Sequence, residues 1–184
     1  MNINKNVIRK EIINLLRNLD RSLRAGKSLI IQKKLIETEV FKRARFVMSY
    51  VSILEEVSTD YLNAKILESG KKLAVPYIDI NKKEMHASLI DSLVGLSQGP
   101  LGTKVPKDGS DNIVCLKEID LIVVPAVAYD IKNNRLGRGG GYYDAFLSNV
   151  NSPTTTVGLA FKCQVLDSLP VEEHDIPVKM VISD

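Results

Sequence analysis

Cysteine is scarce in this chain of 184 residues, tryptophan is absent, and no apolar run is long. Cys115 and Cys163 are too few and too far apart for a disulfide framework or a zinc site. We therefore expect two reduced, partly buried thiols and a cytoplasmic protein. The first residues, Met-Asn-Ile-Asn-Lys-Asn, open no apolar segment that would predict a signal peptide. No apolar run approaches the roughly 20 residues that span a bilayer, so we expect no membrane partner.

The charge balance is also unremarkable. The net charge is +3, and charged residues make up 26% of the chain. No Lys/Arg run with interleaved aromatic residues occurs, so we expect no nucleic-acid partner. The two histidines, His86 and His174, are not spaced as a metal-binding pair. The length and a hydrophobic content of 45% are typical of a soluble protein with one domain, here residues 1–184, and we expect a monomer.

Hydrophobic periodicity predicts alternating helices and strands. Predicted helices cover residues 5–20, a segment from a Ser28 cap to about Glu39, a segment from Ser58 or Thr59 to Gly70, and residues after Gly141. Predicted strands cover residues 46–51, 73–76 with Pro76 as a strand end, 85–89, 121–124, 155–160 and 178–182. Residues 95–112 are predicted to form a long loop. This order predicts an α/β fold with three layers, in which helices flank a mainly parallel central sheet.

The most informative stretch is Arg135 to Asp144, which reads R-L-G-R-G-G-G-Y-Y-D. Glycine N–H groups can approach an anion without a Cβ in the way. Arg135 and Arg138 can add bidentate hydrogen bonds to phosphate oxygens. The stretch comes after the predicted strand 121–124 and before a predicted helix, an order that directs a helix N-terminus toward a phosphate. We therefore interpret it as a phosphate site with Asp144 near it, against the alternative of a flexible surface loop.

General motifs do not identify this site further. The P-loop pattern G-x-x-x-x-G-K-[ST] is absent. If Gly137 and Gly139 were the first glycines of a dinucleotide fingerprint, its third glycine would fall on Tyr142.

The longer stretch 124–147 resembles the signature of the 5-formyltetrahydrofolate cyclo-ligase family, also called 5,10-methenyltetrahydrofolate synthetase. Similar elements occur along nearly the whole chain. They are K-N-V-I-R at Lys5 to Arg9, S-Y-V at 49–51 with E-V-S-T at 56–59, A-F-K-C-Q at 160–164, and P-V-E-E-H-D at 170–175. One departure is Val105, which stands where the family often has glutamate before the proline. If that glutamate shapes the folate pocket in the family, substrate specificity or rate could differ in this chain.

The resemblance implies ATP-dependent conversion of 5-formyltetrahydrofolate to 5,10-methenyltetrahydrofolate, with Mg²⁺ as cofactor. The implied ATP-binding residues are Lys5, Arg9, Arg135, Leu136, Gly137, Arg138, Gly139, Gly140, Gly141, Tyr142 and Tyr143. The implied substrate-binding residues are Val51, Glu56, Arg138, Gly139, Gly140, Gly141 and Tyr142. Arg138 and Tyr142 would be catalytic, with Tyr142 toward the reacting centre and Tyr143 packed inward. Asp144 and Asp175 would bind the metal.

Each implied role has a simpler alternative. Lys5 and Arg9 lie one turn apart, and without the resemblance the spacing favours a pair of solvated cations. Asp144 could instead be a carboxylate that stabilises a helix N-terminus. Asp175 could be a turn or cap residue, and Glu56 could be an exposed carboxylate at a corner of the chain. A nucleotide-sensing protein without turnover and a sugar-phosphate isomerase remain alternatives, although nothing in the sequence selects the carboxylate base that an isomerase needs.

Overall fold

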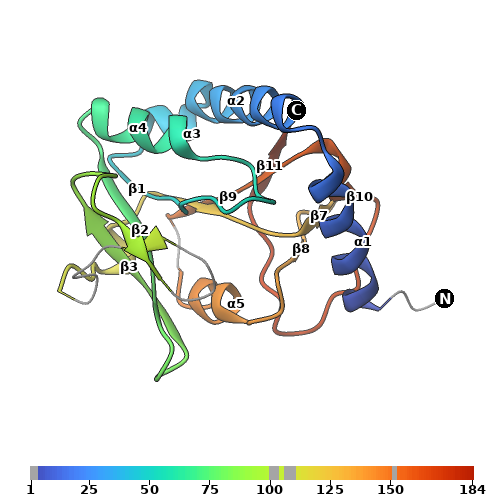
Figure 1. The fold of residues 1–184 in the computed structure, drawn as a ribbon. Coiled ribbons are helices and arrows are strands. Elements are labelled where there is room, and N and C mark those ends of the chain that lie inside the picture. Colours follow the sequence, from blue (N-terminus) through green and yellow to red (C-terminus); the bar gives the residue numbers. More distant parts are fainter. Residues whose placement is uncertain (1–3, 100–103, 106–110, 151–152) are drawn as a thin grey trace.

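The computed structural model describes residues 4–99, 104–105, 111–150 and 153–184, and its centre is a six-stranded sheet (Figure 1). The strands run in the order β11-β9-β6-β1-β2-β3. Their bounds are β1 (Phe46–Met48), β2 (Lys72–Asp79), β3 (Glu84–Ile90), β6 (Leu121–Val124), β9 (Thr155–Ala160) and β11 (Met180–Ser183). Neighbouring strands are parallel except for β2 and β3, which form an antiparallel hairpin.

Helices cover both faces of this sheet. The helices are α1 (Lys5–Asn18), α2 (Arg21–Glu37), α3 (Glu39–Arg43), α4 (Asp60–Glu68) and α5 (Tyr142–Leu147). Figure 1 shows α2, α3 and α4 on one face and α5 on the other. Val47 packs with residues of α1, α2 and α4, whereas its neighbour Met48 packs with residues of α5. The strands are therefore buried on both sides, as in α/β proteins with a mainly parallel sheet. The predicted fold class is confirmed.

Helix capping explains where the first helices begin. The side chain of Asn4 accepts a hydrogen bond from Asn6 N at the start of α1. Asp20 caps α2 by accepting from Leu23 N at 2.9 Å. The predicted cap at Ser28 is wrong. Ser28 is buried inside α2, and its Oγ accepts a hydrogen bond from Ser58 N instead.

The predicted strand end at Pro76 is also wrong, although the proline does limit pairing. Register pairs β1 with β2 only as far as Ala74. Beyond that residue β2 continues to Asp79 against β3 alone. Since proline has no N–H to donate, it is compatible with a strand that has lost one neighbour.

A second, three-stranded sheet carries the arginine-glycine string. Its strands are β7 (Ala128–Asp130), β8 (Arg135–Leu136) and β10 (Val165–Leu166). The glycines follow β8, so the prediction that they come directly after the strand at 121–124 is wrong. Tyr129 in β7 connects this smaller sheet to the main one, because its hydroxyl donates to Val124 O of β6 and its ring packs on β9. A Cβ on Gly158 in β9 would lie 2.5 Å from the ring of Tyr129 in β7, so only glycine fits there.

Smaller elements complete the described chain. Two short strands, β4 (Ser97–Gln98) and β5 (Lys104–Val105), pair within the predicted loop, whose residues 100–103 and 106–110 lie outside the described part. Two 3₁₀ turns are η2 (Leu116–Glu118) and η3 (Lys162–Gln164). Both cysteines are exposed, so their predicted partial burial is wrong. Within the described ranges, no helix is long and apolar enough to span a membrane.

Candidate active site

A cavity of about 480 Å³ lies where α1, the glycine string and the β2–β3 hairpin meet. This volume is in the range of small-molecule sites. Every residue to which the family resemblance assigns a role lines it. These residues are Lys5, Arg9, Val51, Glu56, Arg135, Leu136, Gly137, Arg138, Gly139, Gly140, Gly141, Tyr142, Tyr143, Asp144 and Asp175. Segments separated by up to 170 positions along the chain therefore converge on one space.

The glycine loop, residues 137–141, has a backbone that needs glycine. Gly139 and Gly141 have φ angles of 101° and 72°, which L side chains rarely adopt. Gly141 also immediately precedes α5, which has no side-chain cap at its start. Its N-terminal N–H groups are therefore not taken by a capping side chain. The loop presents backbone donors at the cavity, as a phosphate site requires.

Arg135 is buried beneath the loop rather than extended from it. Its side chain is 2% exposed, and its Nη2 donates to Asp144 Oδ1 at 2.6 Å. Its guanidinium also lies over the ring of Tyr143, 5.8 Å from the centroid. The same Asp144 oxygen accepts a hydrogen bond from Ile176 N. Arg135 thus fixes the start of α5 and the 172–176 segment relative to β8.

Arg138, in contrast, extends from the loop and is 42% exposed. Its Nη2 donates to Glu55 Oε2 at 3.2 Å, and its Nε lies 3.7 Å from Glu56 Oε1. Two adjacent carboxylates therefore hold one edge of this guanidinium.

Glu56 is a largely buried carboxylate, with a side chain that is 15% exposed. Burial raises the pKa of its carboxyl group, and the hydrogen bond from Ile53 N and the charge of Arg138 offset only part of that effect. Without a ligand, this carboxylate is costly to ionise because it has lost water contacts. Hydrogen-bond donors of a bound ligand would replace that water and stabilise the ionised form.

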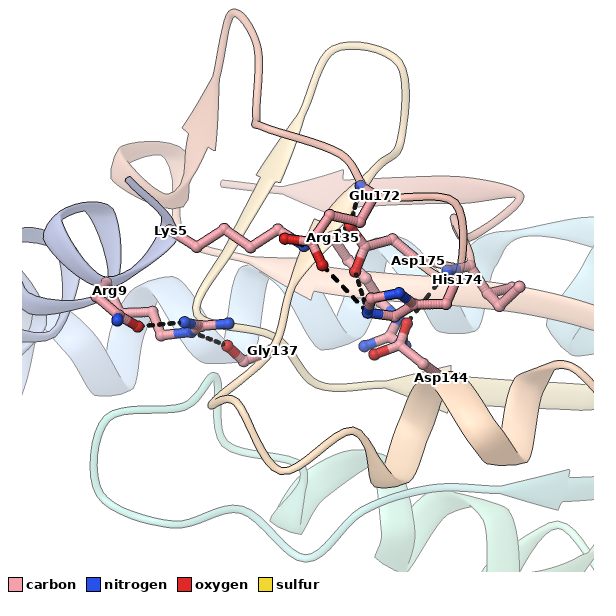
Figure 2. A network of polar contacts seen from close by, with 10 residues as sticks. Lys5, Arg9, Arg135, Gly137, Asp144, Glu172, His174 and Asp175 are labelled. Carbon is pink, nitrogen blue, oxygen red and sulfur yellow. Dashed lines mark hydrogen bonds and ion pairs between the residues drawn. The ribbon is translucent and has the colours of Figure 1, made fainter. Parts of the chain in front are cut away.

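Lys5 and Arg9, the first two cationic side chains of α1, line one side of the cavity, and Figure 2 shows their contacts. Lys5 Nζ lies 2.6 Å from Asp175 Oδ2 and 3.3 Å from Glu172 Oε1. Arg9 Nε donates to Gly137 O at 2.8 Å. Desolvation lowers the pKa of Lys5, but the two carboxylates outweigh it and leave that pKa raised. The two cations are therefore cavity residues, not a solvated pair.

Asp144 and Asp175 have oxygens suited to Mg²⁺. The hydrogen bonds to Asp144 fall on Oδ1, and those to Asp175 fall on Oδ2. Each carboxylate thus keeps one oxygen outside these bonds. Mg²⁺ takes few protein carboxylates and completes its octahedron with phosphate oxygens and water. The donor set fits that preference, although the described residues contain no cluster of three or more His, Cys, Asp or Glu side chains placed to hold a metal alone.

The two tyrosines differ in depth. Tyr143 contacts Phe146 edge to face, and its hydroxyl is buried without a hydrogen-bond partner. Burial raises the pKa of that hydroxyl far above its usual value. Tyr142 is half-buried and packs against Gly140, where an added Cβ would lie 3.0 Å from the ring. Both line the cavity. That Tyr142 faces the reacting centre stays a prediction.

Sequence reasoning missed two features of the site. One is Glu55, whose side chain is 11% exposed and contacts both Arg17 and Arg138. The other is an apolar wall from the β2–β3 hairpin, formed by Pro76, Ile78 and Met85. No motif spacing identifies either, although the adjacent Glu55-Glu56 pair was a visible signal.

Comparisons with known proteins match nearly the whole chain. The chain is 32% identical to the mitochondrial 5-formyltetrahydrofolate cyclo-ligase of Arabidopsis thaliana, over 97% of this chain and 73% of the relative. It is 34% identical to the 5-formyltetrahydrofolate cyclo-ligase of Haemophilus influenzae, over 74% of each. An NMR structure of the 5,10-methenyltetrahydrofolate synthetase of Aquifex aeolicus superimposes with a TM-score of 0.85 at 31% identity, covering 98% of this chain and 90% of that one.

The family model described as the 5-formyltetrahydrofolate cyclo-ligase family matches residues 2–184. With the cavity assembled from the same segments that carry the resemblance, this match is decisive: the chain belongs to the 5-formyltetrahydrofolate cyclo-ligase family.

Proposed function

We propose that this enzyme converts 5-formyltetrahydrofolate to 5,10-methenyltetrahydrofolate with ATP, through a phosphorylated formyl intermediate, and releases ADP and phosphate. The observation that carries the proposal is the single cavity in which the glycine loop, the α1 cations and Glu56 meet. A nucleotide and a folate must lie against each other in this reaction, and one shared cavity provides that proximity.

The chemistry follows from the leaving group. A formamide oxygen leaves poorly, and phosphorylation makes it leave well. The formyl oxygen attacks the γ-phosphorus of ATP, the bond from that phosphorus to the β–γ bridging oxygen breaks, and ADP departs. The folate N10 then attacks the formyl carbon, loses its proton, and closes the ring as the C–O bond breaks and phosphate leaves. The substrate supplies both nucleophiles, so the protein needs only to position the reactants and stabilise phosphoryl charge.

The residues divide these tasks by their position. The glycine-loop N–H groups, Arg9 and Lys5 bind phosphate oxygens. Arg138 stabilises the charge of the transferring phosphoryl group. Val51 and Glu56 bind the folate, where Glu56 accepts hydrogen bonds from pterin donors. The supporting facts are that these side chains line one cavity and that Glu56 is a buried carboxylate with an oxygen directed toward Arg138.

We propose Mg²⁺ as the cofactor, held by Asp144 and Asp175. When bound, it would neutralise negative charge on the ATP phosphates. Lys5 would then exchange part of its contact with Asp175 for a phosphate oxygen, since Lys5 lines the same cavity as the glycine loop. A cytoplasmic location and a monomeric state stay predictions.

The test is direct. Purified protein is mixed with 5-formyltetrahydrofolate and MgATP, and the near-UV absorbance of the methenyl product is followed while ADP and phosphate are measured. Equal amounts of the three products are expected. Normal ATP binding without any methenyl product from fresh substrate would instead support a nucleotide-sensing protein.

A further inference from the structure

Glu55 lies next to the cavity and contacts two arginines from different elements. Among the described residues, no other acidic side chain near the cavity does so. Glu55 Oε1 accepts from Arg17 Nε of α1 at 2.9 Å, and its Oε2 accepts from Arg138 Nη2 of the glycine loop at 3.2 Å. Its side chain is 11% exposed. Burial raises its pKa, but the two arginines outweigh burial and hold that pKa below its usual value. Glu55 is therefore ionised and accepts one hydrogen bond from each of the two arginines.

These contacts link α1, the glycine loop and the segment that carries Glu55 in a closed ring beside the cavity. Arg9 of α1 donates to Gly137 O, Arg138 of the same glycine loop donates to Glu55, and Glu55 accepts from Arg17, again on α1. The loop that carries Glu55 is itself held, because Arg24 donates to Leu54 O. Three segments are thus fixed to one another by charge-assisted bonds, which are the stronger kind.

Glu55 also determines which edge of Arg138 is free. A guanidinium has five donors in a rigid fork. Glu55 takes Nη2, and Glu56 lies nearest Nε. These two contacts occupy the side of the fork that carries Nε, so Nη1 is the nitrogen left for a ligand. A flexible arginine that is 42% exposed would otherwise sample many rotamers, and fixing it in advance removes that cost when phosphate arrives.

We propose that Glu55 is a positioning residue for the reaction. It touches no substrate itself, but holds the Arg138 guanidinium so that one nitrogen is directed at the transferring phosphoryl group, while its bond to Arg17 anchors Glu55 itself to α1. This inference rests on the proposed function, because it concerns the same phosphoryl transfer.

A double-mutant cycle tests it. The four proteins are the wild type, Glu55→Gln, Arg138→Ala and the double variant. Glu55→Gln keeps the shape of the side chain but loses its charge. We expect kcat to fall about 10- to 100-fold, the range for a misplaced catalytic group, with KM for 5-formyltetrahydrofolate changed less than about threefold. In the Arg138→Ala background the same substitution should change kcat by less than about twofold.

Two controls separate positioning from structure. Glu39 on α3 is also a carboxylate with two cationic partners, Lys42 at 3.0 Å and Arg43 at 3.8 Å, but it does not line the cavity. Glu39→Gln should leave kcat unchanged. Glu55→Asp should recover part of the lost rate, because a shorter carboxylate can still pair with Arg138.

The same four proteins are also titrated with MgATP, so that the coupling is measured independently of turnover. Glu55→Gln should weaken MgATP binding in the wild-type background and not in the Arg138→Ala background. If the wild type binds MgATP but forms no methenyl product, the proposed function fails while the binding cycle still tests Glu55. Equal losses of kcat, or of MgATP affinity, in both backgrounds would overturn the positioning role, and so would an unchanged kcat in Glu55→Gln from an active wild type.

Discussion

Arg135 and Arg138 are three residues apart in one string, yet they belong to two different regions of the molecule. Arg135 lies on β8, paired in register with Tyr129, and its side chain is buried against Asp144. Arg138 lies in the glycine loop and is half exposed, held at its edge by Glu55. The same residue type in the same motif is therefore buried as support for the cavity in one region and exposed from the loop in the other. Variants at these and neighbouring residues test that division.

The largest effect is expected from Arg135→Ala. Removing one partner of a buried ion pair leaves Asp144 without its cation, a change that costs about 3–5 kcal/mol. Because 22% of the Asp144 side chain is exposed to water, we expect a loss near the lower end of that energy range. Chemical denaturation measures the loss. Arg135→Lys should recover less than half, because lysine lacks the planar fork. A free energy of unfolding equal to that of the wild type would show that Arg135 has no structural role.

Arg138→Ala should have the opposite profile. Turnover should fall about 10²- to 10³-fold, by analogy with the loss of one preorganised donor at developing charge. The free energy of unfolding should change by less than about 0.5 kcal/mol, since the residue is on the surface. Steady-state kinetics and denaturation on the same sample give both numbers. Unchanged turnover would place Arg138 in solvent and remove it from the mechanism.

Glu56→Gln should weaken folate binding and leave ATP binding nearly intact. The carboxylate only accepts hydrogen bonds, whereas the amide places two donors against the pterin donors. A mispaired buried group costs about 1–3 kcal/mol, or roughly five- to a hundred-fold in affinity. Calorimetric titration with each ligand measures this. Equal losses for both ligands would indicate a folding defect, and an unaffected folate affinity would return Glu56 to a structural role.

Lys5→Met should give the smallest effect, about 0.2–1 kcal/mol of stability at pH 7. Burial raises the pKa of Asp175, but hydrogen bonding to Lys5 and Glu172 outweighs it and lowers that pKa below 3.8. The pKa of Lys5 is raised above 10.5. Stability from this pair is therefore present between those values and lost as the pH falls through the folded-state pKa of Asp175. Denaturation at pH 7 and at successively lower pH should show a difference from wild type that shrinks as Asp175 becomes protonated. A difference that persists in acid would point to lost packing of the lysine stem.

The fold was largely predictable because its strands are short buried runs between clear helical patterns. The segment at 155–160 was predicted with the bounds that the structure shows. The second sheet was missed because two or three residues, as in β8, carry no periodicity. Ser28 looked like a cap because serine often is one, but Asp20 began the helix earlier.

The candidate site was predictable in its membership and not in its geometry. Family resemblance identified side chains that all line one cavity, but it assigned both Arg135 and Arg138 to ATP binding and did not show that Arg135 is buried. Burial separates them, and burial depends on the pairing of β7 and β8, which no local pattern shows. Glu55 was missed for the same reason, since its partners are 38 and 83 positions away. That residues 1–184 form one domain stays a prediction.

The contact between Gly158 and Tyr129 limits how far the arginine-glycine string can be transplanted. The ring of Tyr129 rests where a methyl group on Gly158 would be, and Tyr129 is the register partner of Arg135. Grafting only residues 135–144 onto another parallel sheet would copy the site residues but not the Gly158–Tyr129 contact that orients them. The smallest segment set that can be transferred therefore also includes a glycine in a strand outside the motif, Gly158, and the aromatic residue that packs on it, Tyr129.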